Sequence, residues 1–523
     1  MNRETIITTL QHDHQPWDIV VIGGGATGLG AALEAVTRGY RTILLEQTDY
    51  AKSTSSKSTK LVHGGVRYLA QGDVSLVREA SVERGLLLRN APHLVRNLSF
   101  VIPTFSLWEN VKYTIGLKLY DWMAGRLSLG RSRHISKKEA LNRLATLKTD
   151  RLAGGVLYHD GQFDDSRLAI NLAQTIHDKG GIALNYVKVT SLQKDANGHI
   201  NGVTVMDTLG NVEMKLQTKA VINATGVFVD DILRMDDPSA RKSITASQGV
   251  HVVLDKAFLP GHDALMIPQT SDGRVLFAVP WHNKVVVGTT DTPVSYISLE
   301  PHALEKEINF ILQTAAQYLV RQPTRNDVQS VWAGLRPLAA PKEEGHKTKE
   351  ISRSHKIMVA ASGLVTIIGG KWTTYRRMAE DVVNKVEQSQ QWKPTPSVTH
   401  HMPVHGAVEG MDWNDPWYFY GTDAQEIRKL ADNSPQGNEI VSHSLGIVKA
   451  QIIWAVKAEM ARHVEDFLAR RTRALFLDAT EAQRIAPFVA SIMAAELGYD
   501  NNWIQQEVTA FDTLAKGYLL HQQ

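Results

Sequence analysis

The segment HGGVRYL brings an imidazole, a guanidinium and a phenol close together in the chain. His63 precedes the pair Gly64 and Gly65, and Arg67 and Tyr68 follow that pair. Glycine allows backbone courses that other residues avoid, and a run of hydroxyls and lysines, STSSKSTK, lies just before. This density of polar groups is unusual for a plain connecting loop and indicates a binding or catalytic segment.

A dinucleotide-binding fingerprint lies upstream of this segment. In GGGATG the glycines Gly23, Gly25 and Gly28 follow the apolar run DIVVIG and precede a helical pattern. The first glycine permits a tight turn, the second lets a pyrophosphate approach the backbone, and the third permits close helix packing. Glu46 ends the next apolar strand, where a carboxylate suits a ribose 2′-hydroxyl and would repel a 2′-phosphate. The four residues together predict a bound dinucleotide.

Three features favour FAD over NAD. The fingerprint lies at the extreme N-terminus, INATG ends a later strand, and a third glycine pair ends the last strand and opens a helix. In a glutathione-reductase-like fold the chain returns to the nucleotide domain, with ATG near the adenine half and the late glycines at the isoalloxazine, where a helix N-terminus can stabilise negative charge. Val189, in the strand NYVKVT, is a weaker candidate for a backbone contact to the adenine. The predicted contacts in these segments are Ala224, Gly226, Gly369, Gly370 and Val189.

The order of the motifs carries a family resemblance. TSSKSTKLVHGGVRYL, YHDGQFDDSRL, INATG, VPWHNKVVVGTTDT, GLRPL and GGKWTTYR follow one another as in FAD-dependent sn-glycerol-3-phosphate dehydrogenases of the aerobic, quinone-linked type. EDFLARRTRALFLD resembles the C-terminal helical domain of that family, so the resemblance runs from about Asp18 to beyond Leu497. It implies oxidation of sn-glycerol 3-phosphate at C2 to dihydroxyacetone phosphate, with hydride passing to flavin N5 and electrons passing to a membrane quinone.

The resemblance also assigns roles to matching positions. Arg67, Tyr68, His251, Arg336 and Lys371 match substrate-site residues. The planar fork of arginine suits phosphate oxygens, so we assign the phosphate to Arg336 assisted by Arg67. His251 is the expected base, and Lys371 is placed to stabilise reduced flavin or the developing alkoxide, a role that Arg67 could share. The positions matched to the cofactor in the loop and the late helix are Thr54, Ser55, Ser56, Leu61 and Thr373.

Acidic and histidine-rich segments allow a metal site as an alternative. Asp160, Asp164 and Asp165 lie in DGQFDDSRL, but a cap for the following helix is the favoured interpretation. The histidines of THHMPVH are expected to belong to a connecting segment, and we expect no bound metal. His63 stays without an assigned role.

The electron acceptor has competing interpretations. A soluble glycerol-3-phosphate oxidase that reduces O2 to H2O2 would share the substrate site, although no obvious oxidase-type insertion is present. A non-enzymatic scaffold would have lost Glu46, the late glycines and the substrate cations, all of which are present. The segment Trp108 to His134 mixes aromatics, aliphatics and basic residues, which is typical of a membrane-interfacial amphipathic helix or of a core-packing helix with a basic outer face.

The elements that position these residues predict an α/β (α+β) FAD-binding fold of the glutathione-reductase/amino-acid-oxidase type with a C-terminal all-α domain. A βαβ start is expected from the strand at Asp18, a helix at Thr27 to Arg38 and a strand at Arg41 to Glu46. Further helices are expected at Ser166 to Lys179, His302 to Leu319 and Lys371 to Gln388, and the chain beyond about Asp423 is nearly all helical in pattern. The predicted domains are an FAD-binding domain (1–390) interleaved with a β-rich substrate-binding domain (roughly 85–160 and 240–345), a linker (391–410) and a helical domain (411–523).

Composition limits the remaining alternatives. The chain has 523 residues, a net charge of +3 and no cysteine, so disulfides, thiolate metal sites and a redox-active dithiol are excluded and redox work requires a bound cofactor. The charge gives no support for a nucleic-acid partner. We expect no signal peptide at the N-terminus and, since no apolar run of about 18 residues occurs, no transmembrane helix. We expect a cytoplasmic enzyme held at the inner face of the cytoplasmic membrane, as monomer or homodimer.

Overall fold

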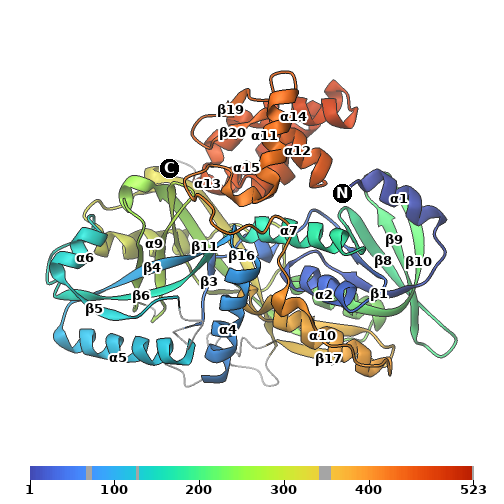
Figure 1. The fold of residues 1–523 in the computed structure, drawn as a ribbon, viewed down its shortest axis with the longest axis horizontal. Coiled ribbons are helices and arrows are strands. Elements are labelled where there is room, and N and C mark those ends of the chain that lie inside the picture. The colour runs from blue at the N-terminus through green and yellow to red at the C-terminus, as the bar shows by residue number, and fades with distance from the viewer. Residues whose placement is uncertain (66–73, 125–128, 272, 341–354, 521–523) are drawn as a thin grey trace.

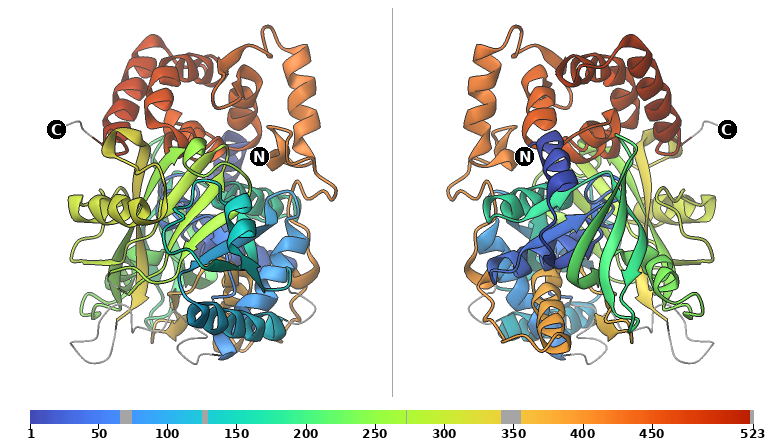
Figure 2. Two further views of the ribbon diagram at one scale, coloured as in Figure 1. Left: turned by 90° about the vertical axis from the view of Figure 1, so that its left-hand side faces the viewer. Right: turned by 90° about the vertical axis from the view of Figure 1, so that its right-hand side faces the viewer.

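Two large sheets with helices around them carry a cap of C-terminal helices (Figure 1). The computed structural model describes residues 1–65, 74–124, 129–271, 273–340 and 355–520. The cap lies on one side of the sheets in all views, and α5 (Leu107–Ala124) lies at the opposite edge (Figures 1 and 2).

The first sheet is the predicted doubly wound nucleotide-binding sheet. Its strand β1 (Trp17–Ile22) is buried and pairs in parallel with β2 (Thr42–Leu45) on one side and with β10 on the other. The helix α2 (Ala26–Thr37) connects β1 to β2, as the fingerprint predicts. The remaining strands among the described residues are β7 (Ile182–Leu184), β8 (Val187–Lys194), β9 (Ile200–Asp207), β10 (Val212–Asn223), β17 (Lys356–Val359) and β18 (Val365–Ile368).

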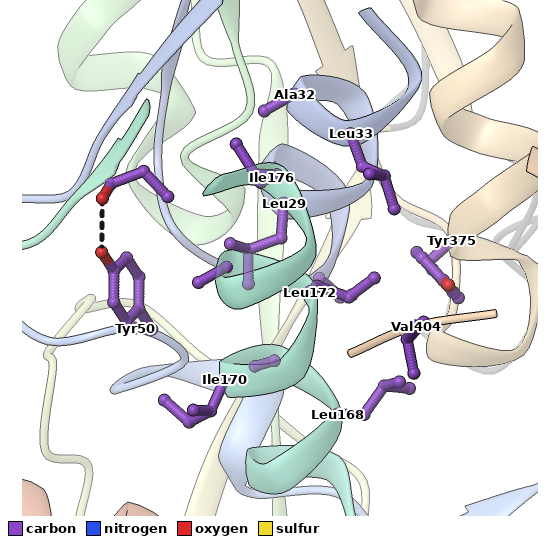
Figure 3. Packing of buried hydrophobic residues seen from close by; sticks show 14 of the residues in the cluster. Leu29, Ala32, Leu33, Tyr50, Leu168, Ile170, Leu172, Ile176, Tyr375 and Val404 are labelled. Carbon is purple, nitrogen blue, oxygen red and sulfur yellow. Dashed lines mark hydrogen bonds between the residues drawn. The ribbon is translucent and has the colours of Figure 1, made fainter. Parts of the chain in front are cut away.

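Helices pack closely over this sheet because small and aliphatic residues face one another. An added Cβ at Gly30 would lie 2.9 Å from Cδ2 of Tyr375, so glycine lets α2 and α10 (Tyr375–Ser389) approach. Figure 3 shows Leu29, Ala32 and Leu33 of α2 facing α7 (Asp165–Asp178). In the same region the hydroxyl of Tyr50 donates to the carbonyl of Ala183 at 2.8 Å.

The second sheet carries two of the predicted substrate residues, His251 and Arg336. Its longest pairing joins β11 (Ile244–Asp255) to β16 (Val328–Ala339), which sets His251 opposite Trp332 and Ser247 opposite Arg336. The other described strands are β3 (Leu61–Val62), β4 (Val95–Thr104), β5 (Arg133–Ser136), β6 (Gly154–Phe163), β12 (Ala264–Ile267), β13 (Leu276–Trp281), β14 (Lys284–Gly288) and β15 (Thr292–Val294).

Most predicted helices are present with ends shifted by a few residues. The expected helix from Trp108 to His134 is wrong at its end, because Arg133–Ser136 forms β5 against β6, while α5 covers the described residues from Leu107 to Ala124. The sequence also did not predict α1 (Arg3–His12). The other helices of this part are α4 (Val74–Asn90), α6 (Lys137–Arg143), α8 (Val229–Asp236) and α9 (Glu305–Tyr318).

The described part of the C-terminal region is mainly helical and also contains a short hairpin that the pattern did not predict, formed by β19 (Ile440–Ser442) and β20 (Ile447–Val448). Within the expected linker, Val404 is buried in the main core and His405 lies between Asp178 and Asp423 at 2.7 and 3.1 Å. This segment is therefore held to the rest of the protein at individual residues, while the division into domains stays a prediction. The helices here are α11 (Asp423–Asn433), α12 (Lys449–Ala458), α13 (Ala474–Leu477), α14 (Ala479–Leu497) and α15 (Asn501–Lys516).

Candidate active site

A cavity of about 710 Å³ is lined by residues of both sheets. This volume lies within the range of about 300–1,000 Å³ that is usual for ligand sites. The cavity runs past the fingerprint turn (Gly23 to Gly28), the hydroxyl loop (Ser53 to Lys60) and the end of β10. It also runs past the late glycine turn (Gly369 and Gly370) and past β11 and β16 of the second sheet. Its lining includes Gly23, Gly25, Glu46, Thr54, Ser55, Leu61, His63, Val189, Ala224, Gly226, His251, Arg336, Gly369, Gly370, Lys371 and Thr373.

The fingerprint glycines form a cradle that side chains would fill. Gly23 has a φ of +109°, and a Cβ there would lie 2.7 Å from the carbonyl oxygen of Ala224. A Cβ at Gly28 would lie 1.8 Å from the carbonyl oxygen of Gly23, so this glycine serves helix packing behind the cavity. At Gly25 a Cβ would lie 3.1 Å from Oγ of Ser55. The backbone is thus open to a pyrophosphate where the motif requires it, and these residues fit the nucleotide part of FAD.

Glu46 supports the fingerprint turn as well as lining the cavity. Its Oε2 accepts the N–H of Gly24 at 2.6 Å, and its Oε1 accepts the N–H and the hydroxyl of Thr48 at 2.9 Å. Burial raises the pKa of Glu46, and the hydrogen bonds from Gly24 and Thr48 oppose that rise. The predicted contact of Glu46 with a ribose stays a prediction.

The hydroxyl loop holds the two sheets together around the cavity. Thr54 donates to the carbonyl of Leu335 on β16 at 2.6 Å, and Oγ of Ser55 accepts the N–H of Ala26 at 3.0 Å. The indole of Trp372 donates to the carbonyl of Ser55 at 2.8 Å. Ser56 differs from its neighbours, because its hydroxyl is buried and does not line the cavity.

Lys60 is a functional candidate that sequence reasoning treated only as part of a polar loop. Its side chain is fully buried, and Nζ lies 2.8 Å from both carboxylate oxygens of Asp165. Oγ of Ser58 donates to the same carboxylate at 2.7 Å. The ammonium lies 5.0 to 5.5 Å from the ring centres of Trp281, Trp332 and Phe476. This network anchors the hydroxyl loop to α7 and sets the ammonium of Lys60 against Phe476 of the C-terminal helices.

His251 lines the cavity from β11. Its ring stacks on Trp332 with 5.3 Å between centroids, and its Nε2 lies 2.9 Å from Oγ1 of Thr59. Burial, Arg336 and Lys60, in that order, hold the pKa of His251 well below its usual value. The imidazole is therefore neutral at neutral pH, which is the form that accepts a proton.

Arg336 is held in a fixed orientation at the cavity wall. Its Nη2 donates to Oγ1 of Thr289 at 3.1 Å and to the carbonyl of Thr290 at 3.0 Å, and its Nη1 lies 3.4 Å from Asp291. The hydroxyl of Ser247 donates to the same carboxylate of Asp291. These partners lie in GTTDT, a motif that the resemblance singled out without assigning it a role. A guanidinium fixed in this way keeps its planar fork in one orientation at the cavity wall.

The late glycine turn carries the remaining predicted residues. Gly369 and Gly370 have φ values of +80° and +89°, a region that favours glycine. The turn brings Lys371 and Thr373 to the cavity, and the hydroxyl of Thr373 lies 3.5 Å from the carbonyl of His63. His63 therefore lines the cavity too. Arg67 and Tyr68 lie outside the described residues, so their predicted substrate contacts stay predictions.

The acidic residues of DGQFDDSRL bind basic side chains and a helix end. Asp164 caps α7, as predicted, and also pairs with Arg473 at 2.9 Å. Asp160 pairs with Arg84 at 2.7 Å. In the part of the chain that the structure describes, no group of three or more His, Asp or Glu side chains is arranged for a metal ion.

The C-terminal helices are joined to the nucleotide end through a buried ion-pair network. Asp49, three residues beyond Glu46 in the chain, accepts Nε of Arg470 and Nη1 of Arg471, each at 2.6 Å. All three side chains are buried. Burial would raise the pKa of Asp49, but Arg471 and Arg470 outweigh it and hold the pKa below the usual range. In the sequence, the only indication of this ion-pair network is the cluster of arginines in EDFLARRTRALFLD.

The fold and the cavity define an FAD-dependent oxidoreductase, and a family model described as "FAD dependent oxidoreductase" matches residues 18–376. A second family model, "C-terminal domain of alpha-glycerophosphate oxidase", matches residues 365–503. The chain belongs to the family of FAD-dependent glycerol-3-phosphate dehydrogenases. It is 38% identical to the mitochondrial glycerol-3-phosphate dehydrogenase of Homo sapiens, over 97% of this chain and 74% of that protein. It is 39% identical to that of Arabidopsis thaliana, over 94% of this chain and 85% of that protein.

Solved structures agree with this assignment. The glycerol-3-phosphate dehydrogenase of Bacillus halodurans complexed with FAD aligns with a TM-score of 0.80 and 29% identity, covering 100% of this chain and 99% of that chain. The L-alpha-glycerophosphate oxidase of Mycoplasma pneumoniae aligns with a TM-score of 0.56 and 17% identity, covering 73% and 97%. The latter likeness shows the shared fold. The predicted cofactor and fold class are confirmed.

Proposed function

We propose that this dehydrogenase oxidises sn-glycerol 3-phosphate to dihydroxyacetone phosphate and passes the electrons to a membrane quinone while attached to the membrane surface through α5. The observation that supports attachment is a stripe of exposed apolar side chains on the outer face of α5. Trp108, Ile115 and Trp122 are 74%, 64% and 78% exposed, and Val111 and Leu119 are exposed between them. Their spacing of three or four residues places all five on one helix face.

The opposite face of α5 is used for packing. Leu117 and Tyr120 are buried, and the hydroxyl of Tyr120 donates to Asp160 at 3.0 Å and accepts the N–H of Gly64 at 2.8 Å. The helix is therefore positioned by its inner face, and the apolar outer face is additional to what packing needs. This supports the interfacial interpretation, because core packing accounts only for the inner face.

The charges around the stripe also suit a membrane surface. Lys112 and Lys118 are exposed on α5 beside the stripe, and lysines next to exposed tryptophans favour an anionic interface. Contiguous exposed apolar patches on soluble proteins often mark such contacts. No helix among the described residues is both long and apolar enough to cross a bilayer, so the proposed attachment is to one leaflet.

Within the cavity we assign the phosphate to Arg336 and the proton of the C2 hydroxyl to His251. The guanidinium is fixed by Thr289 and Thr290 and matches phosphate oxygens. When bound, the flavin of this family accepts the two electrons of the C2–H bond as hydride. Lys371, directly after the flavin turn, is placed to stabilise negative charge, and Arg67 keeps its predicted share in binding the substrate.

Anaerobic reduction followed by controlled reoxidation tests this function. Glycerol 3-phosphate should bleach the flavin absorbance of the holoenzyme without oxygen, and glycerol at the same concentration should not. A quinone analogue, with vesicles present, should then restore the absorbance faster than oxygen. Stoichiometric H2O2 formation with the quinone analogue ignored would instead identify a glycerol-3-phosphate oxidase.

The proposed base has its own test. His251→Asn should slow flavin reduction in a single anaerobic turnover by about 100-fold or more, the usual contribution of a general base. Binding of the substrate should change much less than the rate. Fast reduction in this variant would place the base elsewhere.

A further inference from the structure

His251 has a fixed orientation with little access to the cavity. Its side chain is only 2% exposed, and one face of the ring stacks on Trp332. Gly288 lies against the ring edge, where an added Cβ would be 2.3 Å from Cδ2 of His251. Because both the face and this edge are covered, the ring cannot turn toward a substrate without displacing β14.

The two nitrogens of His251 differ in their surroundings. Nδ1 is buried and has no hydrogen-bond partner among the residues that the structure describes. Nε2 lies 2.9 Å from Oγ1 of Thr59, within the distance required for proton transfer. Thr59 is half-buried and lines the cavity. The hydroxyl of Thr59 therefore covers the nitrogen that could take a proton.

Thr59 is held rigidly on both sides. Ser58 donates to Asp165 through its backbone N–H at 3.2 Å and its hydroxyl at 2.7 Å, and Lys60 binds the same carboxylate. Lys60 also donates to the carbonyl of Ser56 at 2.6 Å. The backbone on each side of Thr59 is thus anchored to α7, which fixes its hydroxyl between the cavity and the imidazole.

We propose that Thr59 is a catalytic residue that passes the proton of the substrate C2 hydroxyl to His251. A hydroxyl can accept one proton while it donates its own, so the substrate O–H bond breaks toward Oγ1 of Thr59 as the Thr59 proton moves to Nε2 of His251. The electron pair of the C2–H bond leaves as hydride to the oxidised flavin, and the C2–O bond becomes a carbonyl. Protons and electrons balance, and no further reactant is needed.

Substrate binding would prepare this transfer. Arg336 is, after burial, the next cause that lowers the pKa of His251. A phosphate bound at Arg336 would offset that charge and raise the pKa of His251, making it a better acceptor once the substrate is in place. The inference rests on the proposed function in one respect, namely that His251 is the base.

Variants of the holoenzyme separate the relay from the base. Thr59→Val removes the hydroxyl at nearly constant shape and should slow anaerobic flavin reduction by glycerol 3-phosphate by about 100-fold, with FAD content unchanged. Thr59→Ser retains the hydroxyl and should remain close to the unsubstituted rate. The double variant Thr59→Val/His251→Asn should be no slower than His251→Asn alone, because both residues serve one path.

The outcomes distinguish the two claims. Fast reduction by Thr59→Val together with slow reduction by His251→Asn overturns the relay and leaves the base in place, whereas fast reduction by both removes the base itself. Should Thr59→Val lose FAD, the unsubstituted holoenzyme decides the question through the rate of flavin reduction in mixtures of H2O and D2O. Two protons in flight give a curved dependence on deuterium content, and a linear dependence would overturn the relay.

Discussion

Replacing the apolar stripe of α5 is the most direct test of membrane attachment. We consider the triple variant Trp108→Ser/Ile115→Ser/Trp122→Ser. These side chains are 74%, 64% and 78% exposed, so the folded core loses little when they are changed. Any effect should therefore appear in vesicle binding and not in unfolding.

The expected magnitude follows from the exposed area of these side chains. Complete burial of one large apolar side chain contributes about 1.5–3 kcal/mol. The three side chains are exposed over roughly two thirds to three quarters of their surface, and they insert only partly at the interface. Together they therefore contribute roughly 2–3 kcal/mol to the free energy of membrane binding. At about 1.4 kcal/mol per tenfold change, the partition coefficient should fall roughly 30- to 100-fold.

Co-sedimentation with anionic phospholipid vesicles measures that coefficient. The matched control replaces three exposed apolar residues on other elements, Tyr296, Val320 and Tyr499, which are 54%, 63% and 46% exposed, each with serine. The control should bind vesicles as the unsubstituted protein does, and both variants should keep flavin reduction by glycerol 3-phosphate. If the α5 variant and the control bind equally well, α5 is not the attachment surface.

Three further outcomes are expected elsewhere in the molecule. Arg336→Ala should raise the KM for glycerol 3-phosphate by roughly 10- to 100-fold, since hydrogen bonds to charged groups contribute roughly 1.5–3 kcal/mol, while the flavin absorbance stays unchanged; an unaltered KM would remove Arg336 from the site. Asp49→Ala should lower the free energy of unfolding by about 3–5 kcal/mol because it removes the buried carboxylate that Arg470 and Arg471 share, whereas Glu426→Gln in an exposed pair should change it by about 0–1 kcal/mol; equal urea midpoints would contradict this difference. Burial opposes protonation of His405, but hydrogen bonds to Asp423 and Asp178 outweigh it and raise the pKa of His405 to about 9. Protonated His405 therefore contributes stability to the fold that is complete below the unfolded-state pKa of about 6.5 and is lost as the pH rises through about 9. His405→Gln should flatten the pH dependence of the thermal unfolding midpoint between those pH values. A retained slope would refute the assignment.

Local patterns predicted the nucleotide-binding start well. The apolar run before Gly23 forms β1, and α2 follows it within one residue of the predicted start. Asp164 caps α7 as expected from its place before a helical pattern. These features depend on neighbours in the chain, which is why spacing alone indicates them.

Patterns failed where distant segments compete for the same residues. Trp108 to His134 has the composition of one helix, yet Arg133–Ser136 pairs with β6 because that strand offers an open hydrogen-bonding edge. The hairpin of β19 and β20 also lies within a helical pattern, but its pairing is local, and its two short strands satisfy each other. In both cases strand pairing outweighs the local helical preference.

The sequence by itself determined the cofactor, the family and the doubly wound fold, because these are written in short motifs whose glycines and carboxylates have local geometric requirements. Only the tertiary structure decided how the site works. It buried Lys60 against Asp165 and Phe476, covered Nε2 of His251 with Thr59, and turned the apolar face of α5 outward. Burial and charge pairing depend on groups far apart in the chain, so no spacing pattern contains them.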